Sequence, residues 1–247
     1  MKSRYRLIAL DMDGTVLDEE KRISSRNKEA IRAAVDAGII VMFATGRGYM
    51  SAMPYVRELH LQSPLITVNG SEIWLGPGKL YKRHLMEHET ILRLRQLALE
   101  NDVWYWAYTV EGVVNRENWE ENTSTDWLKF GFYTEEPDKL KTIRETVTQW
   151  GSFEITNSHP YNIELNPKGV SKAEGLREIC KQLGIGMHET VTVGDSLNDL
   201  EMIRASGLGV AMENAQETVK QEADWITKSN EEDGVAEVIL NKVLNQK

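Results

Sequence analysis

The chain has few of the features that mark secreted or membrane proteins. It contains one cysteine, Cys180, in 247 residues, so no disulfide can form within it and a cytoplasmic location is expected. No stretch approaches the roughly 18 consecutive apolar residues that a membrane-spanning helix needs. The first apolar run ends at Asp11 after four residues, which is too short for a signal peptide. A soluble protein without a membrane partner is therefore predicted.

Positive charge is also in short supply. Lysine and arginine number 29 against 38 aspartate and glutamate residues, which gives a net charge of −9. Nucleic acids and anionic lipid surfaces are bound mainly through lysine and arginine, so neither is an expected partner. A small anionic substrate is compatible with this charge if a metal ion or a local cluster of cations attracts it. The composition carries no signal for an oligomeric state.

Short apolar runs alternate with helical patterns in residues 1–83, which is typical of a parallel sheet covered by helices. The expected buried strands are Leu7–Leu10, Ile39–Ala44 and Leu65–Val68. A helix between the first two should have Ser24 or Ser25 as its N-cap and end at Gly38. Next, Glu72–Leu75 and Leu80–Arg83 predict a hairpin. This part of the chain therefore reads as an α/β core.

Residues 84–167 differ from the preceding part in amino-acid composition, since five of the seven tryptophans fall in this stretch. The expected elements are helices near Glu89–Asn101 and Asp138–Trp150 and strands near Val103–Thr109, Gly112–Asn115 and Asn162–Leu165. The core pattern then resumes with a helix from Ser171, a strand at Thr190–Val193, a helix from Leu197 and an apolar run at Leu208–Ala211. We therefore expect a core domain of residues 1–83 and 168–247 with an inserted α+β domain of residues 84–167.

Polar side chains gather where the predicted core strands end. Asp11 and Asp13 follow the first strand and Thr45 ends the second, while the strand after the insertion is followed by Asp195, Ser196, Asn198 and Asp199. Ligands bind at this edge of open parallel sheets. Four carboxylates at one edge would repel one another unless a cation lies between them, and oxygen ligands suit Mg²⁺. The pattern therefore predicts a magnesium site.

These residue types suit phosphoryl transfer. A carboxylate can attack phosphorus to give an acyl phosphate that water later hydrolyses, and Asp11 comes directly off its strand. Asp13 would protonate the leaving oxygen and then deprotonate the water, from a turn that Gly14 permits. Thr45 would donate a hydrogen bond to the phosphate. Lys172 should lie at a helix N-terminus, because residues 171–174 match a capping box, and would add positive charge there.

The same residues resemble the motifs of the haloacid dehalogenase superfamily over nearly the whole chain. Asp11–Leu17 is similar to its first motif, Thr45-Gly46-Arg47 to its second, Lys172 to its third and Gly194–Asp199 to its fourth. The position of the insertion resembles the Cof-type branch, whose C2-type cap is an α+β domain and whose members hydrolyse small phosphorylated metabolites. The resemblance therefore implies a Rossmann-like core, an inserted cap and a magnesium-dependent phosphatase.

The resemblance also implies roles for individual residues. Asp11 and Asp13 would be catalytic, and the substrate phosphate would be bound by Thr45, Gly46, Lys172 and Asn198. The Mg²⁺ would be held by Asp11, the carbonyl group of Asp13 and Asp195, with Asp199 and Asn198 acting through water or Lys172. A phosphomutase of the same superfamily and a catalytically silent sensor of phosphorylated metabolites are the alternatives.

Several residues have more ordinary interpretations. An EF-hand is disfavoured because Gly14 is the fourth residue of the acidic turn, not the sixth, and a strand precedes the turn. Residues 195–199, taken alone, could simply start a helix. Arg47 could contact substrate or form a surface ion pair. The aromatic run 104–108 is expected to pack the cap more than to line a pocket, the pair His84 and His88 to lie at the surface, and Cys180 to belong to the core.

Overall fold

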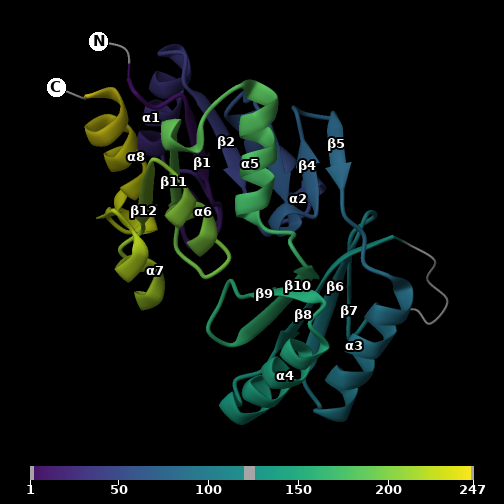
Figure 1. Cartoon of the computed structure of the whole chain (residues 1–247). Coiled ribbons are helices and arrows are strands. Elements are labelled where there is room, and N and C mark those ends of the chain that lie inside the picture. The colour runs from purple at the N-terminus through teal and green to yellow at the C-terminus, as the bar shows by residue number, and fades with distance from the viewer. Residues whose placement is uncertain (1–2, 120–125, 246–247) are drawn as a thin grey trace.

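The computed structural model describes residues 3–119 and 126–245, which form two separate β-sheets with their own helices (Figure 1). The larger sheet has eight strands in the order β13-β12-β11-β1-β2-β3-β4-β5. Its parallel strands are β1 (Leu7–Leu10), β2 (Ile40–Ala44), β3 (Leu65–Thr67), β11 (Thr190–Gly194), β12 (Leu208–Ala211) and β13 (Trp225–Ile226). An antiparallel edge follows with β4 (Glu72–Trp74) and β5 (Leu80–Arg83). The α/β architecture expected from the sequence is confirmed.

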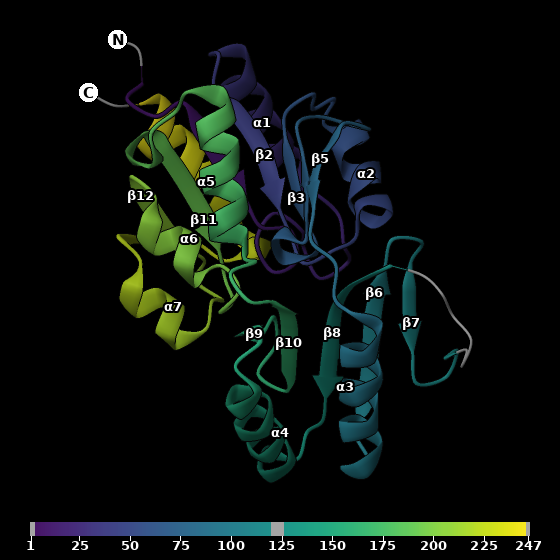
Figure 2. The ribbon, with the colours of Figure 1, turned by 45° about the vertical axis from the view of Figure 1, so that its right-hand side comes forward.

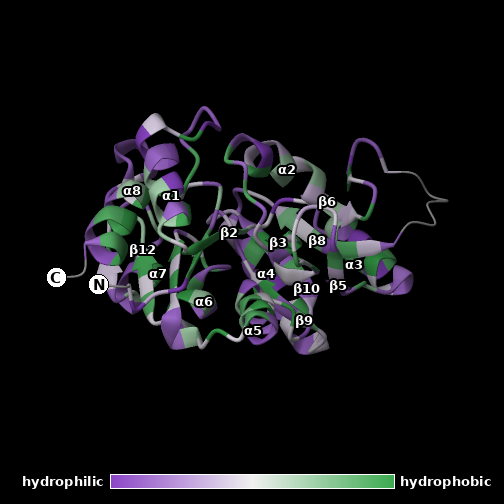
Figure 3. Cartoon of the chain, turned by 90° about the horizontal axis from the view of Figure 1, so that it is seen from above, coloured by the Kyte–Doolittle hydropathy of each residue, from purple (hydrophilic) through white to green (hydrophobic). Residues whose placement is uncertain are grey.

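Helices cover both faces of this sheet (Figure 2). One face packs against α1 (Ser25–Asp36), α2 (Tyr49–Glu58) and α8 (Gly234–Val238), and the other against α5 (Lys172–Leu183) and α6 (Leu200–Ala205). A further short helix, α7, spans Glu217–Glu222, and a π-helical turn at Ile239–Leu244 continues α8. Hydrophobic and hydrophilic residues lie on different sides of helices such as α5 (Figure 3). All four residues of β1 are buried, which explains its uninterrupted apolar sequence.

The smaller sheet is antiparallel, with strand order β7-β6-β8-β10-β9. Its strands are β6 (Trp104–Thr109), β7 (Val113–Asn115), β8 (Trp127–Tyr133), β9 (Phe153–Thr156) and β10 (Asn162–Pro167). Two helices, α3 (His88–Glu100) and α4 (Pro137–Trp150), share a separate hydrophobic core with one face of this sheet. We propose residues 84–167 as the cap domain; this range includes 120–125, which lie outside the described residues.

The local signals at the ends of the core elements are confirmed. Ser24 is the N-cap of α1, its side chain accepts a hydrogen bond from the amide of Asn27, and Gly38 follows the helix with a φ of 82°. Ser171 is the N-cap of α5, and its side chain accepts a hydrogen bond from the amide of Glu174.

Within the described residues, no helix is long and apolar enough to cross a membrane.

The elements α2, β8, β9 and β13 were not expected from the sequence. In α2, Pro54 lies inside the helix, and such a residue normally signals a helix boundary. In β8, Lys129 and Gly131 interrupt the apolar run, although the strand is buried along most of its length. The helix expected from Leu197 begins at Leu200, after a turn.

Gly70, which follows β3, lies close to the backbone at the start of α5. Its φ is 102°, and a Cβ atom there would lie 2.4 Å from the carbonyl oxygen of Ser171. Gly70→Ala is therefore expected to lower the melting temperature and the activity together, because the N-terminus of α5 would shift. Gly38→Ala is the matched control, since its φ of 82° is also positive but nothing lies within 4 Å. Equal losses of melting temperature for both variants would contradict this explanation.

Candidate active site

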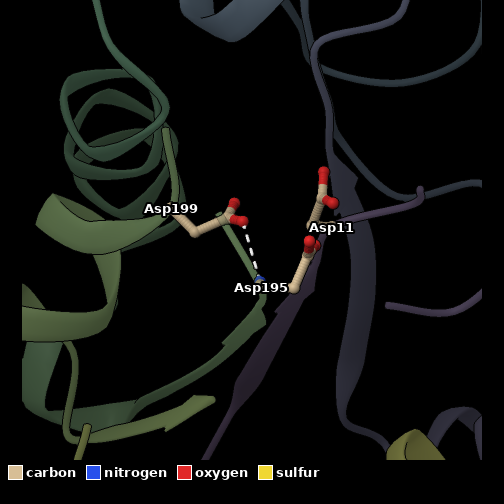
Figure 4. Close-up of side chains that lie close together, drawn as sticks. All are labelled: Asp11, Asp195 and Asp199. Carbon is tan, nitrogen blue, oxygen red and sulfur yellow. Dashed lines mark hydrogen bonds between the residues drawn. The ribbon is translucent and has the colours of Figure 1, made fainter. Parts of the chain in front are cut away.

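Three aspartates meet at the carboxyl ends of β1 and β11 (Figure 4). Oxygen atoms of Asp11, Asp195 and Asp199 all lie within 4.8 Å of one another. The two strands are parallel neighbours, so the residues that follow them emerge side by side. The structure therefore brings together three of the four acids that were expected at this edge of the sheet.

Lys172 joins two of these carboxylates. Its Nζ atom donates to Oδ1 of Asp11 at 2.6 Å and to Oδ1 of Asp199 at 2.8 Å. Asp199 Oδ2 accepts from the backbone amides of Asp195 and Ser196 at 3.0 and 3.1 Å. Both oxygens of Asp199 are therefore engaged, and it holds Lys172 and the loop after β11 in place. Asp199 is also the N-cap residue of α6. It therefore starts a helix and contributes to the cluster of acids at the same time.

Negative charge is crowded at this site. Burial raises the pKa of Asp11, and the carboxylates of Asp199 and Asp195 raise it further against the opposing effect of Lys172. Burial, with Asp199 nearby, likewise raises the pKa of Asp195 to about 6. A cation would relieve this repulsion, and carboxylate oxygens are hard ligands that suit a divalent ion. The donor set therefore fits a divalent metal.

Asp13 faces a different set of partners. Arg47 donates to its two carboxylate oxygens at 2.6 and 2.7 Å, and Lys21 donates to Oδ1 at 2.9 Å. Burial alone would raise its pKa, but these hydrogen bonds outweigh that effect and lower the pKa of Asp13 to about 2. Its carboxylate does not belong to the trio of acids, and the predicted metal contact through its carbonyl group stays a prediction. Gly14 has a φ of 76°, as the predicted turn requires.

A cavity of about 260 Å³ lies between the two sheets and receives Asp11, Asp13, Thr45, Gly46, Arg47 and Asn198 from the core. Thr45 Oγ1 accepts the amide hydrogen of Arg47 at 3.1 Å, which leaves the hydroxyl hydrogen of Thr45 available to a ligand. Asn198 Nδ2 donates to Asn69 at 3.3 Å, and its buried Oδ1 has no hydrogen-bond partner among the described residues. Of the four predicted substrate-binding residues, Thr45, Gly46 and Asn198 therefore line one cavity, whereas Lys172 is not in its wall and contacts the lining residue Asp11.

The cap closes this cavity with residues that the sequence did not indicate. Lys129 of β8 donates to Glu164 Oε2 and to the carbonyl oxygen of Gly46, each at 3.2 Å. Glu164 of β10 also accepts from Asn69 at 2.6 Å. A lysine inside the aromatic run of residues 127–133 was the available signal for this contact. These bonds join the cap to the core beside Asp11.

The structure also bears on the other residues that the sequence singled out. Tyr105 packs in the cap core as expected, whereas Tyr108 lines the cavity, with Lys129 Nζ 4.8 Å from its ring centroid. Arg47 lines the cavity and forms an ion pair with Asp13, and its contact with substrate stays a prediction. Cys180 is buried in the core, and His88 is exposed but accepts a hydrogen bond from the indole of Trp127.

Comparisons with known proteins agree with this geometry. A family model of haloacid dehalogenase-like hydrolases matches residues 8–127 and 114–239. The chain is 45% identical over 239 residues to a Bacillus subtilis 5-amino-6-(5-phospho-D-ribitylamino)uracil phosphatase, covering 97% of this chain and 96% of that protein. It is 30% identical to the B. subtilis phosphatase YwpJ, covering 95% and 98%. A B. subtilis haloacid dehalogenase-like hydrolase of known structure superposes with a TM-score of 0.89 at 27% identity, covering 96% and 100% of the two chains. The chain therefore belongs to the haloacid dehalogenase-like hydrolases and is a phosphatase.

Proposed function

We propose that this phosphatase hydrolyses small phosphorylated metabolites with Mg²⁺ and with Asp11 as the nucleophile. Phosphatases of this family use a divalent metal, and the choice of Mg²⁺ follows from the oxygen ligands. The observation that carries the proposal is the position of Asp11: it lies at the end of β1, bonded to Lys172, and it lines the cavity beneath the cap. A cytoplasmic location, expected from the single cysteine, is part of the same proposal.

Asp11 would attack the phosphorus atom, forming a bond between its carboxylate oxygen and phosphorus while the bond to the leaving alcohol breaks. Lys172 and the hydroxyl group of Thr45 would donate hydrogen bonds to the phosphoryl oxygens. A divalent cation held by Asp11 and Asp195 would neutralise the crowded carboxylates and the phosphate. Because the pKa of Asp11 is raised, such a cation would also keep this nucleophile ionised at neutral pH.

Asp13 would supply and then remove protons. With a pKa of about 2 it is ionised at neutral pH, which suits the second step, in which a base takes a proton from the attacking water. In the first step the leaving oxygen needs a proton or a cation. We propose that a bound substrate draws Arg47 and Lys21 toward itself, which would raise the pKa of Asp13 and allow it to carry that proton.

The B. subtilis relative of 45% identity suggests the kind of substrate, since its name gives a uracil derivative with a phosphorylated ribityl chain. We propose a polyol phosphate of this type for the present chain, with the phosphate at Asp11. The cavity wall offers both donors and acceptors to hydroxyl groups, among them Lys129 and the unpaired Oδ1 of Asn198.

Steady-state hydrolysis of phosphorylated metabolites, followed by phosphate release with Mg²⁺ and with a chelator, tests the proposal. We expect turnover that requires the metal and a preference for phosphomonoesters. An isomerised sugar phosphate without free phosphate would favour a phosphomutase. Binding of metabolites without turnover across the panel would favour a sensor.

Asp195→Asn tests the charge balance at the metal site. The folded protein binds the proton of Asp195 more tightly than the unfolded chain does, because the pKa is about 6 against an ordinary 3.8. The metal-free protein should therefore lose stability as the pH rises from about 4 to about 6. Asp195→Asn should remove that loss and raise the metal-free melting temperature at pH 7 by a few degrees.

The same variant should no longer be stabilised by Mg²⁺. Thermal unfolding with Mg²⁺ and with chelator, at pH 5 and pH 7.5, measures both effects. Asp36→Asn on the exposed surface of α1 is the control. An unchanged rise in melting temperature on adding Mg²⁺ to Asp195→Asn would show that Asp195 is not a ligand.

A further inference from the structure

A second cavity, of about 270 Å³, adjoins the one that contains Asp11. The two cavities share Tyr108 of β6, which lines both. The second lies between the start of α2 on the core and the β6–β7 hairpin of the cap, and its wall includes Tyr49, Trp74 and Val113. A molecule that passes the Tyr108 side chain would therefore extend from one cavity into the other.

The two cavities differ in chemistry. Charged groups dominate the first, including Asp11, Lys129 and Glu164. In the second, the rings of Tyr49 and Trp74 are stacked with centroids 3.9 Å apart and an interplanar angle of 26°, and Leu128 and Val113 add apolar surface. Its wall contains two carboxylates: the buried Glu72 is already bound by Arg83 at 2.6 and 2.8 Å, and Glu111 is exposed in the turn between β6 and β7. The second cavity therefore suits a flat, largely uncharged group.

A shift in register between β6 and β8 places residues of these strands in both cavities. Tyr108 pairs with Lys129 and Thr109 pairs with Trp127, so Leu128 is the extra residue of a bulge. The bulge allows two consecutive residues of β8 to serve different cavities: Leu128 lines the second and Lys129 lines the first. On the core side Gly48 gives Tyr108 its room, since a Cβ atom there would lie 3.3 Å from the tyrosine ring.

Size also connects the two cavities. Pockets for small ligands usually measure roughly 300 to 1,000 Å³, and each cavity alone is below that range. Together they fall within it. The first cavity has room for a phosphate and a short polyol. In a larger substrate, the part most distant from the phosphate must therefore lie outside the first cavity.

We propose that the second cavity binds a planar ring at the end of the substrate that is opposite its phosphate. The polyol that links the ring to the phosphate would then pass Tyr108 and Lys129. This inference rests on the proposed function, because it assumes that the phosphate is bound at Asp11. Trp74 and Tyr49 provide the aromatic surface against the ring, and Tyr108 separates the ring from the charged groups around the phosphate. The cavity thereby selects ring-bearing polyol phosphates over simple sugar phosphates.

The test compares two esters that share a polyol: 5-amino-6-(5-phospho-D-ribitylamino)uracil and D-ribitol 5-phosphate, which lacks the ring. We expect kcat/KM for the ring-bearing ester to be at least tenfold higher in the wild type. Val113→Trp, which fills the second cavity from a half-exposed position, should remove this advantage and leave the ribitol 5-phosphate value within twofold. Val35→Trp is the matched control, because Val35 of α1 is 43% exposed against 45% for Val113 and lies outside both cavities.

Calorimetric binding to the Asp11→Asn variant separates this inference from the proposed function. If neither ester is hydrolysed, the proposed substrate class is wrong, yet the two dissociation constants still report on the ring. A dissociation constant at least tenfold lower for the ring-bearing ester, abolished by adding Val113→Trp, supports the ring site. Equal dissociation constants for the two esters, or an equal effect of Val113→Trp on both, would overturn it.

Discussion

Asp11→Asn is expected to lower kcat by at least about 10⁴-fold, because an amide cannot form the acyl phosphate that divides the reaction into two easier steps. The substitution preserves shape, and an amide oxygen can still accept the hydrogen bond from Lys172. It also removes one of three crowded carboxylates. The melting temperature should therefore be unchanged or higher, so that lost activity cannot be attributed to unfolding.

Phosphate release with Mg²⁺ measures the rate of Asp11→Asn, and acid quenching of the wild type with a ³²P-labelled ester measures the covalent intermediate. Label should remain on the wild-type protein and be absent from the variant. Asp36→Asn again serves as the control for an exposed carboxylate. A residual kcat within tenfold of the wild type would show that another group attacks phosphorus.

Lys172→Met is expected to have the largest combined effect on stability and activity. Lys172 and Asp199 have no exposed side-chain surface, and the ammonium group lies between Asp199 and Asp11. Removing it leaves two buried carboxylates without their counterion, which typically destabilises a protein by about 3–5 kcal/mol. The phosphate would also lose a cationic partner, so we expect kcat/KM to fall by at least about 10³-fold.

A double variant separates the two losses. Lys172→Met with Asp199→Asn removes a carboxylate together with the lysine, so it should recover part of the stability but none of the activity. Chemical denaturation at pH 7 measures the free energy of unfolding of each variant, and Lys141→Met on the exposed face of α4 is the control. If the double variant is as unstable as Lys172→Met, buried charge is not the cause of the loss.

The core and the acidic motifs at its strand ends were predictable because their signals are local. Strand β1 is buried on both faces, so its sequence is an unbroken apolar run, and the chain turns polar at Asp11 where the strand ends. The caps of α1 and α5 depend on hydrogen bonds between residues three apart, and Ser24 and Ser171 were identified for that reason. Parallel pairing of β1 with β11 then brings Asp11 to Asp195, as the order of elements implied.

The cap side of the site was not predictable from local patterns. A lysine is usually exposed to solvent, whereas Lys129 is buried, and its charge is neutralised by Glu164 from a strand more than thirty positions later. The low pKa of Asp13 likewise depends on Arg47, which a separate strand and turn bring to it.

Local sequence patterns were enough to predict the α/β core, an inserted cap and the acidic residues at the strand ends, because strand burial, helix caps and strand-end motifs are encoded over a few neighbouring residues. The packed fold was needed to identify the cap residues that close the cavity, the pairing of Asp13 with Arg47 and Lys21, and the position of Tyr108 between two cavities of different polarity. Those properties depend on distances between segments far apart in the chain, and such distances are set by how the two sheets pack.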